Sequence, residues 1–303
     1  MVGPFAAGGE WLRCALHAHT TRSDGELAPE ALAAHYARAG YDVLAITDHW
    51  RRTDAQSDGL LVIASAELNC VLPGTRDGHV LAFGIDAEPA ELGREYADLA
   101  RTADWVEEHG GIAYLAHPYW SGLIPGDLEL PANVRGIEVY NAGCELEIGR
   151  GLSSVHWDEL LDAGQRCLAI ATDDSHHPGF DSDLAWAWVR AEERTRDAVI
   201  DALRRGGFYS STGPRVFGVE VDGDAVEVRS SPCRSATLLA GKTVGAAAHA
   251  GRLPYCHRAR VLERADDGTI TRARLEIPSG SAYARLELVD RDGRKAWTNP
   301  VWR

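Results

Sequence analysis

Short apolar segments alternate with amphipathic segments over residues 11–212 of this 303-residue chain. Apolar runs typical of strands occupy residues 14–19, 41–49, 60–68, 79–85, 111–118, 136–141, 166–174, 185–191 and 208–213. Helical patterns occupy residues 29–40, 91–110, 153–164 and 194–207. Strands that alternate with helices indicate a mainly parallel sheet, and the number of units favours a barrel over a minimal doubly wound sheet.

The pattern changes from about residue 214 onward. Residues 215–231 and 273–302 alternate apolar and polar positions around Asp-Gly pairs, which predicts antiparallel hairpins. Strong helical patterns are missing from this part of the sequence. We therefore predict two domains, an α/β barrel over residues 1–213 and a small antiparallel β domain over residues 214–303.

Charge and apolar content narrow the class of protein. The net charge of −14 disfavours a nucleic acid polymer as partner, although bound cations would reverse the sign locally and admit a small anionic substrate. No apolar run has the length of a membrane span, and the first residues lack the pattern of a secretory leader. These features predict a soluble, cytoplasmic protein without membrane attachment, and they specify no oligomeric state.

Metal-binding side chains stand at the ends of five strand-like runs. His17 and His19 are two residues apart on a strand, so both side chains leave the same face. His49, Glu67 and His117 end three further runs, and an Asp-Asp-Ser-His segment at residues 173–176 ends the fifth. In a parallel barrel the carboxyl ends of the strands meet on one rim, so one site would collect all of these groups.

The ligand chemistry is imidazole and carboxylate without thiolate, which suits Zn, Mn or Fe(II). The candidates number nine: His17, His19, Asp24, His49, Glu67, His79, His117, Asp174 and His176. This count is too high for one ion, so we expect two or three divalent metals. The choice between Asp173 and Asp174 is left open, with the Asp-x-His spacing favouring Asp174.

The segment from Leu16 to His49, LHAHTTRSDGELAPEALAAHYARAGYDVLAITDH, resembles the first two motifs of the PHP (polymerase and histidinol phosphatase) family of metal-dependent phosphoesterases. The AHP and TDDSHH segments are similar to its third and fourth motifs. The resemblance implies a distorted (β/α)7 TIM-like barrel with a trinuclear metal centre. It further implies three ligand sets: His17, His19, Glu67 and Asp174; Glu67, His79 and His117; and Asp24, His49 and His176. The C-terminal segment resembles the CehA/McbA-like branch, which includes a carbamate-ester hydrolase.

These features predict a metal-dependent hydrolase that acts on a small phosphate ester through a metal-bound hydroxide. Glu67 would bridge two ions, and His117 or His176 would help to protonate the leaving group. Arg51, Arg52, Tyr119 and Trp120 follow strand ends and are candidate substrate contacts. Three alternatives stay open: a carboxylic or carbamate ester hydrolase on the same centre, a metal-dependent deaminase or cyclic-amide hydrolase, and a non-catalytic metal-binding module.

Overall fold

The structure is a computed structural model that describes residues 3–72, 75–92, 97–251 and 253–303. The chain divides into two compact units, Gly9–Arg205 and Gly206–Arg303, and the second unit also includes Met1–Gly8. In the described part of the chain, no helix combines the length and the apolar character needed to cross a membrane.

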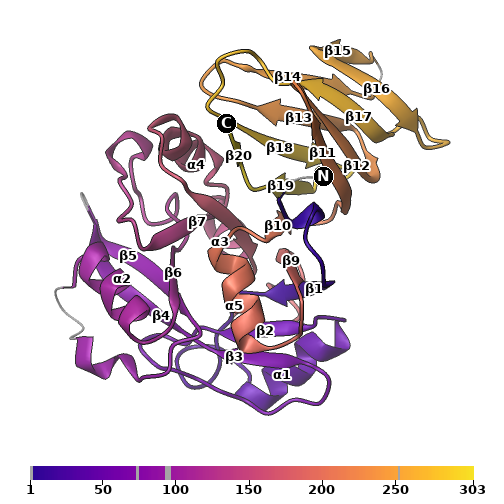
Figure 1. The fold of residues 1–303 in the computed structure, drawn as a ribbon. Helices are drawn as coiled ribbons and strands as arrows, with labels where there is room; N and C mark the ends of the chain where they lie inside the picture. The colour runs from indigo at the N-terminus through magenta and orange to yellow at the C-terminus, as the bar shows by residue number, and fades with distance from the viewer. Residues whose placement is uncertain (1–2, 73–74, 93–96, 252) are drawn as a thin grey trace. The chain divides into compact units, whose positions relative to one another are not determined.

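Two sheets form the first unit (Figure 1). One has the strand order β9 (Trp186–Ala191), β1 (Glu10–Ala15), β2 (Val43–Ile46) and β3 (Leu61–Ala64). The other has the order β4 (Ala66–Leu72), β5 (Thr75–Phe83), β6 (Ile112–Leu115), β7 (Val134–Asn141) and β8 (Leu168–Thr172). Strands β1–β3 are parallel to one another, as are β6–β8, whereas β9 runs antiparallel to β1.

The predicted α/β class is confirmed, but the mainly parallel barrel is not. Strand β5 is antiparallel to β4, because the short connection after Leu72 leaves no room for the helical crossover that parallel strands need. It is also antiparallel to β6. Two single parallel bridges, Ala18–Ser175 and His49–Glu67, join the ends of the two sheets. A continuous ladder around seven strands is therefore absent from the described residues.

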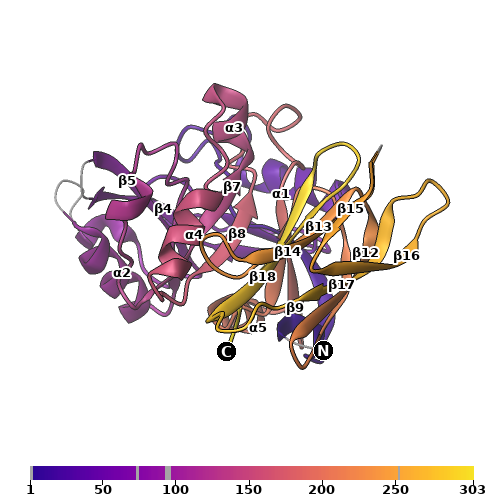
Figure 2. The same cartoon turned by 90° about the horizontal axis from the view of Figure 1, so that it is seen from above.

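Among the described residues, five α-helices accompany these sheets: α1 (Pro29–Arg38), α2 (Leu99–Glu108), α3 (Ala142–Ile148), α4 (Ser154–Asp162) and α5 (Arg196–Arg204). Helix α2 packs on β4, β5 and β6, and α5 packs on β9 and β3 (Figure 1). Figure 2 shows α4 beside β7. Short 3-10 helices lie at Gly3–Phe5, Pro89–Leu92 and Pro125–Asp127.

The helix expected over residues 91–110 is shorter in the structure. Helix α2 begins at Leu99, where the Asp98 side chain accepts a hydrogen bond of 2.8 Å from the Arg101 amide as N-cap. Residues 93–96 of the predicted helix lie outside the described residues. Helix α3 was not expected, because it spans only seven residues and begins directly at the end of β7.

Helix α1 shows how the first unit buries its apolar positions. Its residues Leu32 and Tyr36 are fully buried in a cluster with Leu44 and Ile46 of β2. Burying side chains of this size contributes roughly 1.5–3 kcal/mol each. This packing fixes the ends of β1 and β2, where the first predicted ligands stand.

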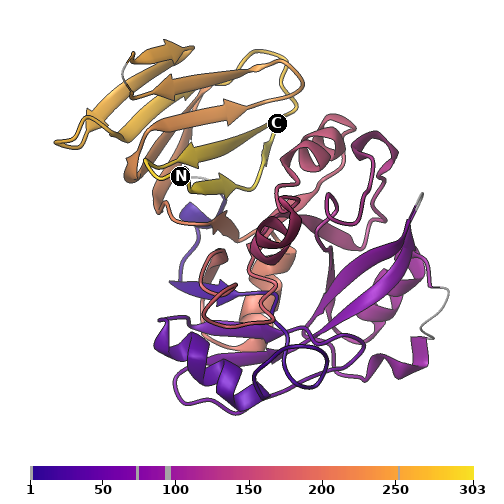
Figure 3. The same cartoon turned by 180° about the vertical axis from the view of Figure 1, so that it is seen from behind.

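The second unit consists of two antiparallel sheets that lie face to face (Figure 3). One has the order β15 (Tyr255–His257), β14 (Gly245–His249), β13 (Ser235–Leu239), β18 (Tyr283–Val289), β19 (Lys295–Thr298) and β10 (Phe208–Ser211), with β20 (Val301–Trp302) beside β18. The other has the order β11 (Val216–Asp222), β12 (Ala225–Cys233), β17 (Ile270–Glu276) and β16 (Ala259–Arg264). Strand β10, which falls within the predicted residues 1–213, pairs with β19.

Candidate metal centre

All nine predicted ligands lie in the first unit, and the structure brings them together. Their nitrogen and oxygen atoms fall into three groups, in each of which the atoms lie within 4.8 Å of one another. The groups are His17, His19, Glu67 and Asp174; Glu67, His79 and His117; and His19, Asp24, His49 and His176. They match the three ligand sets that the resemblance implies, with His19 joining the third as well.

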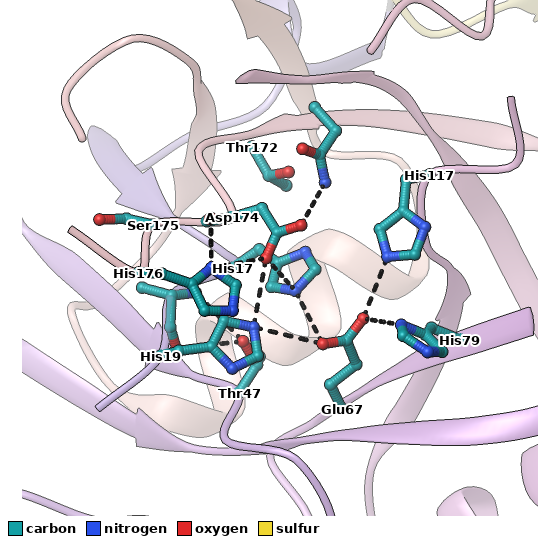
Figure 4. A network of polar contacts seen from close by, with 12 residues as sticks. His17, His19, Thr47, Glu67, His79, His117, Thr172, Asp174, Ser175 and His176 are labelled. Atoms are coloured by element: carbon teal, nitrogen blue, oxygen red, sulfur yellow. Dashed lines mark hydrogen bonds and ion pairs between the residues drawn. The ribbon is translucent and has the colours of Figure 1, made fainter. Parts of the chain in front are cut away.

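Glu67 on β4 is the centre of this cluster (Figure 4). Its Oε2 atom lies 3.2 Å from Nε2 of both His17 and His19. Its Oε1 atom lies 2.7 Å from Nδ1 of His79 and 3.2 Å from Nε2 of His117. One carboxylate thus faces two groups of imidazoles with different oxygen atoms, which is the arrangement of a bridging ligand.

Asp174, two residues after the end of β8, is the fourth member of the first group. Its Oδ1 atom lies 3.0 Å from His17 Nε2 and 3.2 Å from His19 Nε2. Two backbone hydrogen bonds hold this segment beside the first histidines, from the Asp174 amide to the His17 carbonyl and from the His19 amide to the Ser175 carbonyl. The register of the β1 and β8 ends therefore sets the distance between these ligands.

The third group is more exposed than the other two. Asp24 Oδ1 lies 3.5 Å from both His19 Nδ1 and His176 Nε2, and Asp24 Oδ2 lies 3.5 Å from His49 Nε2. The exposed fraction of the Asp24 side chain is 53%, against 2% for Glu67. A Cβ atom at Gly25 would lie 2.3 Å from the His19 carbonyl oxygen, so the loop that carries Asp24 requires glycine there.

Four buried atoms of the cluster have no hydrogen-bond partner among the described residues: His17 Nε2, His19 Nε2, His49 Nδ1 and Asp174 Oδ1. Leaving such groups unpaired is costly unless another partner satisfies them. Two ligands that each lie about 2.1 Å from a tetrahedral cation would be about 3.4 Å apart. The imidazole-to-carboxylate distances of 3.0–3.3 Å around Glu67 Oε2 and Asp174 Oδ1 are close to this spacing, so the donor set fits divalent cations.

The carboxylates and imidazoles of the cluster shift one another's pKa values. Burial by itself raises the pKa of Glu67, but the neighbouring His79 and His17 outweigh burial and hold the pKa of this carboxyl well below its usual range. Burial lowers the pKa of His19, yet its close contacts with the carboxylates of Asp174 and Glu67 raise it to about 9. The carboxylates of Glu67 and Asp174, whose pKa values are both lowered, are therefore ionised at neutral pH, and a cation would compete with protons for the imidazoles.

Two of the candidate ligands have a strained backbone. His117 has φ of 26° and Asp174 has φ of 54°, in the left-handed region that residues with a side chain rarely adopt. Such strain persists where the surrounding structure enforces it, commonly at functional sites. Hydrogen bonds supply that restraint, because Glu138 Oε2 accepts from the His117 amide at 2.8 Å and Asn141 Nδ2 donates to Asp174 Oδ2 at 3.0 Å.

Glu138 is a functional position that sequence reasoning missed. It lies on β7, is fully buried, and accepts hydrogen bonds from His17 Nδ1 at 2.7 Å and from Thr172 Oγ1 at 2.5 Å, both on Oε1. Its Oε2 atom also accepts from Asn141 Nδ2 at 2.9 Å. The signal was an acidic residue inside the apolar run GIEVYN, which burial alone does not favour.

The acidic residues next to the ligands have structural contacts. Asp173 accepts hydrogen bonds from Tyr36 and from the amides of residues 183–185, so Asp174 and not Asp173 faces the cluster. Asp48 accepts from the Thr20 amide and hydroxyl and from Ser23, and it caps the loop between His19 and Asp24. Both carboxylates therefore hold the segments that carry the ligands.

A cavity of about 480 Å³ opens beside the cluster. Among the four predicted substrate contacts, Trp120 alone lines it. Arg51 is exposed, Arg52 donates from Nε to the Ile85 carbonyl, and Tyr119 lies with its ring centroid 6.1 Å from that of His156. The positions of these three side chains do not support a role in substrate binding.

No family model and no curated protein matches this chain. Among solved structures, it is similar to a two-domain protein from Bacteroides vulgatus containing a predicted PHP-like metal-dependent phosphoesterase, with 18% identity, a TM-score of 0.54, and coverage of 96% of this chain and 95% of that one. An amidohydrolase from Chromobacterium violaceum has 18% identity and a TM-score of 0.40, covering 55% of this chain and 89% of that one. A proposed metal-dependent phosphoesterase from Bifidobacterium adolescentis has 16% identity and a TM-score of 0.41, covering 55% and 88%. The first likeness shows a shared fold.

Proposed function

We propose that this chain is a metal-dependent hydrolase of the PHP type that acts on a small phosphate ester and binds up to three divalent cations. The observation that supports this most is the convergence of nine imidazole and carboxylate side chains with four buried atoms that lack a hydrogen-bond partner among the described residues. The fold shared with the Bacteroides vulgatus protein agrees with the proposal.

His17, His19, Glu67 and Asp174 would hold one cation, Glu67, His79 and His117 a second, and Asp24, His49 and His176 a third. Such cations, when bound, lower the pKa of water and offset negative charge on the transferring group. Glu67 sets the spacing between the first two groups, because each of its oxygens faces one of them. Glu138 orients His17 so that Nε2 faces the cluster.

The leaving group needs a proton, and the sequence offered His117 or His176 for this role. An imidazole nitrogen that binds a cation has no proton to donate. His177 lines the same cavity and is absent from the three ligand groups among the described residues. We therefore propose His177 for protonation of the leaving group, with His176 and His117 as ligands.

A small molecule suits the site better than a polymer. The cavity of about 480 Å³ is in the range of small-ligand pockets. A net charge of −14 disfavours the binding of a long phosphate backbone.

A second candidate is the hydrolysis of a neutral carboxylic or carbamate ester, as the resemblance to the CehA/McbA-like branch would suggest. One observation favours it: within the described part of the chain, no arginine or lysine lines the cavity. A doubly charged phosphate group would then depend on the cations alone for its binding.

A hydrolysis panel separates these proposals. Protein loaded with Zn, Mn or Fe(II) would be assayed on p-nitrophenyl phosphate, a phosphodiester and p-nitrophenyl acetate, with a chelator-treated sample and His17→Ala as controls. We expect phosphate ester turnover that both controls lose. Turnover of the neutral ester alone with every metal would replace the first proposal by the second, and metal binding without any turnover would indicate a non-catalytic module.

A further inference from the structure

The cavity beside the ligand cluster is also lined by apolar side chains. Trp120, Leu146 and Phe180 all line it, from three separate segments of the first unit. Leu146 on α3 is 47% exposed and Phe180 is 69% exposed. When a ligand covers apolar surface that faces water, the free energy falls. These side chains therefore indicate which kind of chemical group the cavity accepts.

Trp120 is held in place beside the ligand groups. Its indole Nε1 donates a hydrogen bond of 2.8 Å to Oε2 of Glu147, which also belongs to α3. The centroid of the Trp120 ring lies 4.9 Å from that of His117 in an edge-on arrangement and 6.1 Å from that of His79. The indole therefore forms a fixed apolar wall directly beside the second ligand group.

The carboxylates of Glu147 and Asp181 line the cavity and accept hydrogen bonds from the protein. Glu147 accepts from Trp120, and Asp181 accepts from Ser175 Oγ and from the amides of His176 and His177. The cavity lining contains no arginine or lysine among the described residues. A leaving group with negative charge would meet carboxylates and apolar rings without a cationic side chain, whereas an apolar leaving group would cover Trp120, Leu146 and Phe180.

We propose that Trp120, Leu146 and Phe180 form a binding subsite for a flat apolar leaving group, so that the preferred substrate is the phosphate monoester of an aromatic or arylalkyl alcohol. This inference rests on the proposed function. A nucleotide or sugar phosphate is disfavoured, because its polar leaving group would leave the apolar side chains of Trp120, Leu146 and Phe180 uncovered.

The test compares benzyl phosphate with ethyl phosphate, because both release a simple primary alcohol and differ mainly in the aromatic ring. With metal-loaded protein we expect kcat/KM for benzyl phosphate to be at least about tenfold higher, equivalent to about 1.4 kcal/mol. Leu146→Ser and Phe180→Ser should each bring this ratio to within about threefold of unity. Ile148→Ser is the matched control, since Ile148 stands two residues away on α3, is 57% exposed and does not line the cavity.

A binding measurement keeps this inference distinct from the proposed function. Saturation-transfer NMR of benzyl alcohol with zinc-loaded protein should show binding that Leu146→Ser and Phe180→Ser weaken and Ile148→Ser does not. If neither phosphate is hydrolysed but this binding pattern appears, the phosphoesterase proposal fails and the apolar subsite stands. Hydrolysis of both phosphates with equal kcat/KM overturns the subsite alone. Absence of both hydrolysis and binding overturns both.

Discussion

The Nδ1 nitrogen of His17 donates a hydrogen bond of 2.7 Å to Oε1 of Glu138, and neither side chain is exposed to solvent. The carboxylate fixes the imidazole tautomer that carries its proton on Nδ1, which leaves Nε2 free to bind a cation. Oε2 of Glu138 accepts from the His117 amide. One buried side chain therefore positions ligands of two groups that follow different strands.

We expect Glu138→Gln to weaken zinc affinity by roughly 10- to 100-fold, the usual effect of removing a partner behind a metal ligand. Competition with a coloured chelator measures this affinity. Glu159→Gln is the control, because Glu159 is exposed on α4. Thermal unfolding of both variants separates lost affinity from lost folding. Unchanged zinc affinity in folded Glu138→Gln would contradict the positioning role.

Glu67→Gln is expected to reduce both metal content and hydrolysis. The substitution keeps the shape of the side chain but removes the charge that faces His17 and His19 through one oxygen and His79 and His117 through the other. Activity should fall by more than about 100-fold, since even partners behind metal ligands cost up to that factor. His249→Gln, in exposed surroundings on β14, should retain parent activity. Equal activity of the two variants would show that the ligand assignment is wrong.

Metal-loaded protein should contain about three divalent ions per chain, since three or four protein ligands are typical of each ion. The ion held by Asp24, His49 and His176 should leave first under chelator, because these side chains are 53%, 29% and 28% exposed. Asp24→Asn should lower the metal content by about one ion, as elemental analysis would show. One ion or fewer in the reconstituted parent protein would refute a trinuclear centre.

Cation affinity should increase with pH between about 6.5 and 9. The folded-state pKa of His19 is raised from 6.5 to about 9 because contacts with Asp174 and Glu67 outweigh the opposing effect of burial. In metal-free protein the charged imidazole thus contributes stability that is complete below about pH 6.5 and is lost as the pH rises through 9. A bound cation requires the neutral imidazole, so its binding releases protons.

Isothermal titration calorimetry with zinc at pH 7.5, in buffers that differ in ionisation enthalpy, measures this release. We expect about one proton or more per chain. His249→Gln should show the same release as the parent, because His249 is exposed and outside the cluster. Zinc affinity that does not change from pH 6.5 to 9 would contradict the expectation.

Sequence by itself determined the ligand types and the segments that carry them. The run of His17, His19 and Asp24, and the polar residues that end later apolar runs, predicted a common site because chemically similar groups recurred at equivalent positions of strands. Period-2 spacing predicted that His17 and His19 face the same way. Both reach Glu67 Oε2 in the structure, although β1 ends at Ala15. The α/β class and a β-rich C-terminal region also followed from local periodicity.

Tertiary structure decided what depends on contacts between distant segments. A continuous barrel is missing from the described residues because of how the strands pair, with β5 antiparallel to both neighbours, and an apolar run does not encode which strand it pairs with. The choice of Asp174 over Asp173 depends on side-chain direction at φ of 54°, and Asp173 turns instead to Tyr36 and the amides beyond it. An acidic residue inside an apolar run marks Glu138 as unusual, but its partner His17 follows from the packing of β7 beside the first strand end. Likewise, the apolar wall of Trp120, Leu146 and Phe180 exists only because three segments meet at one cavity.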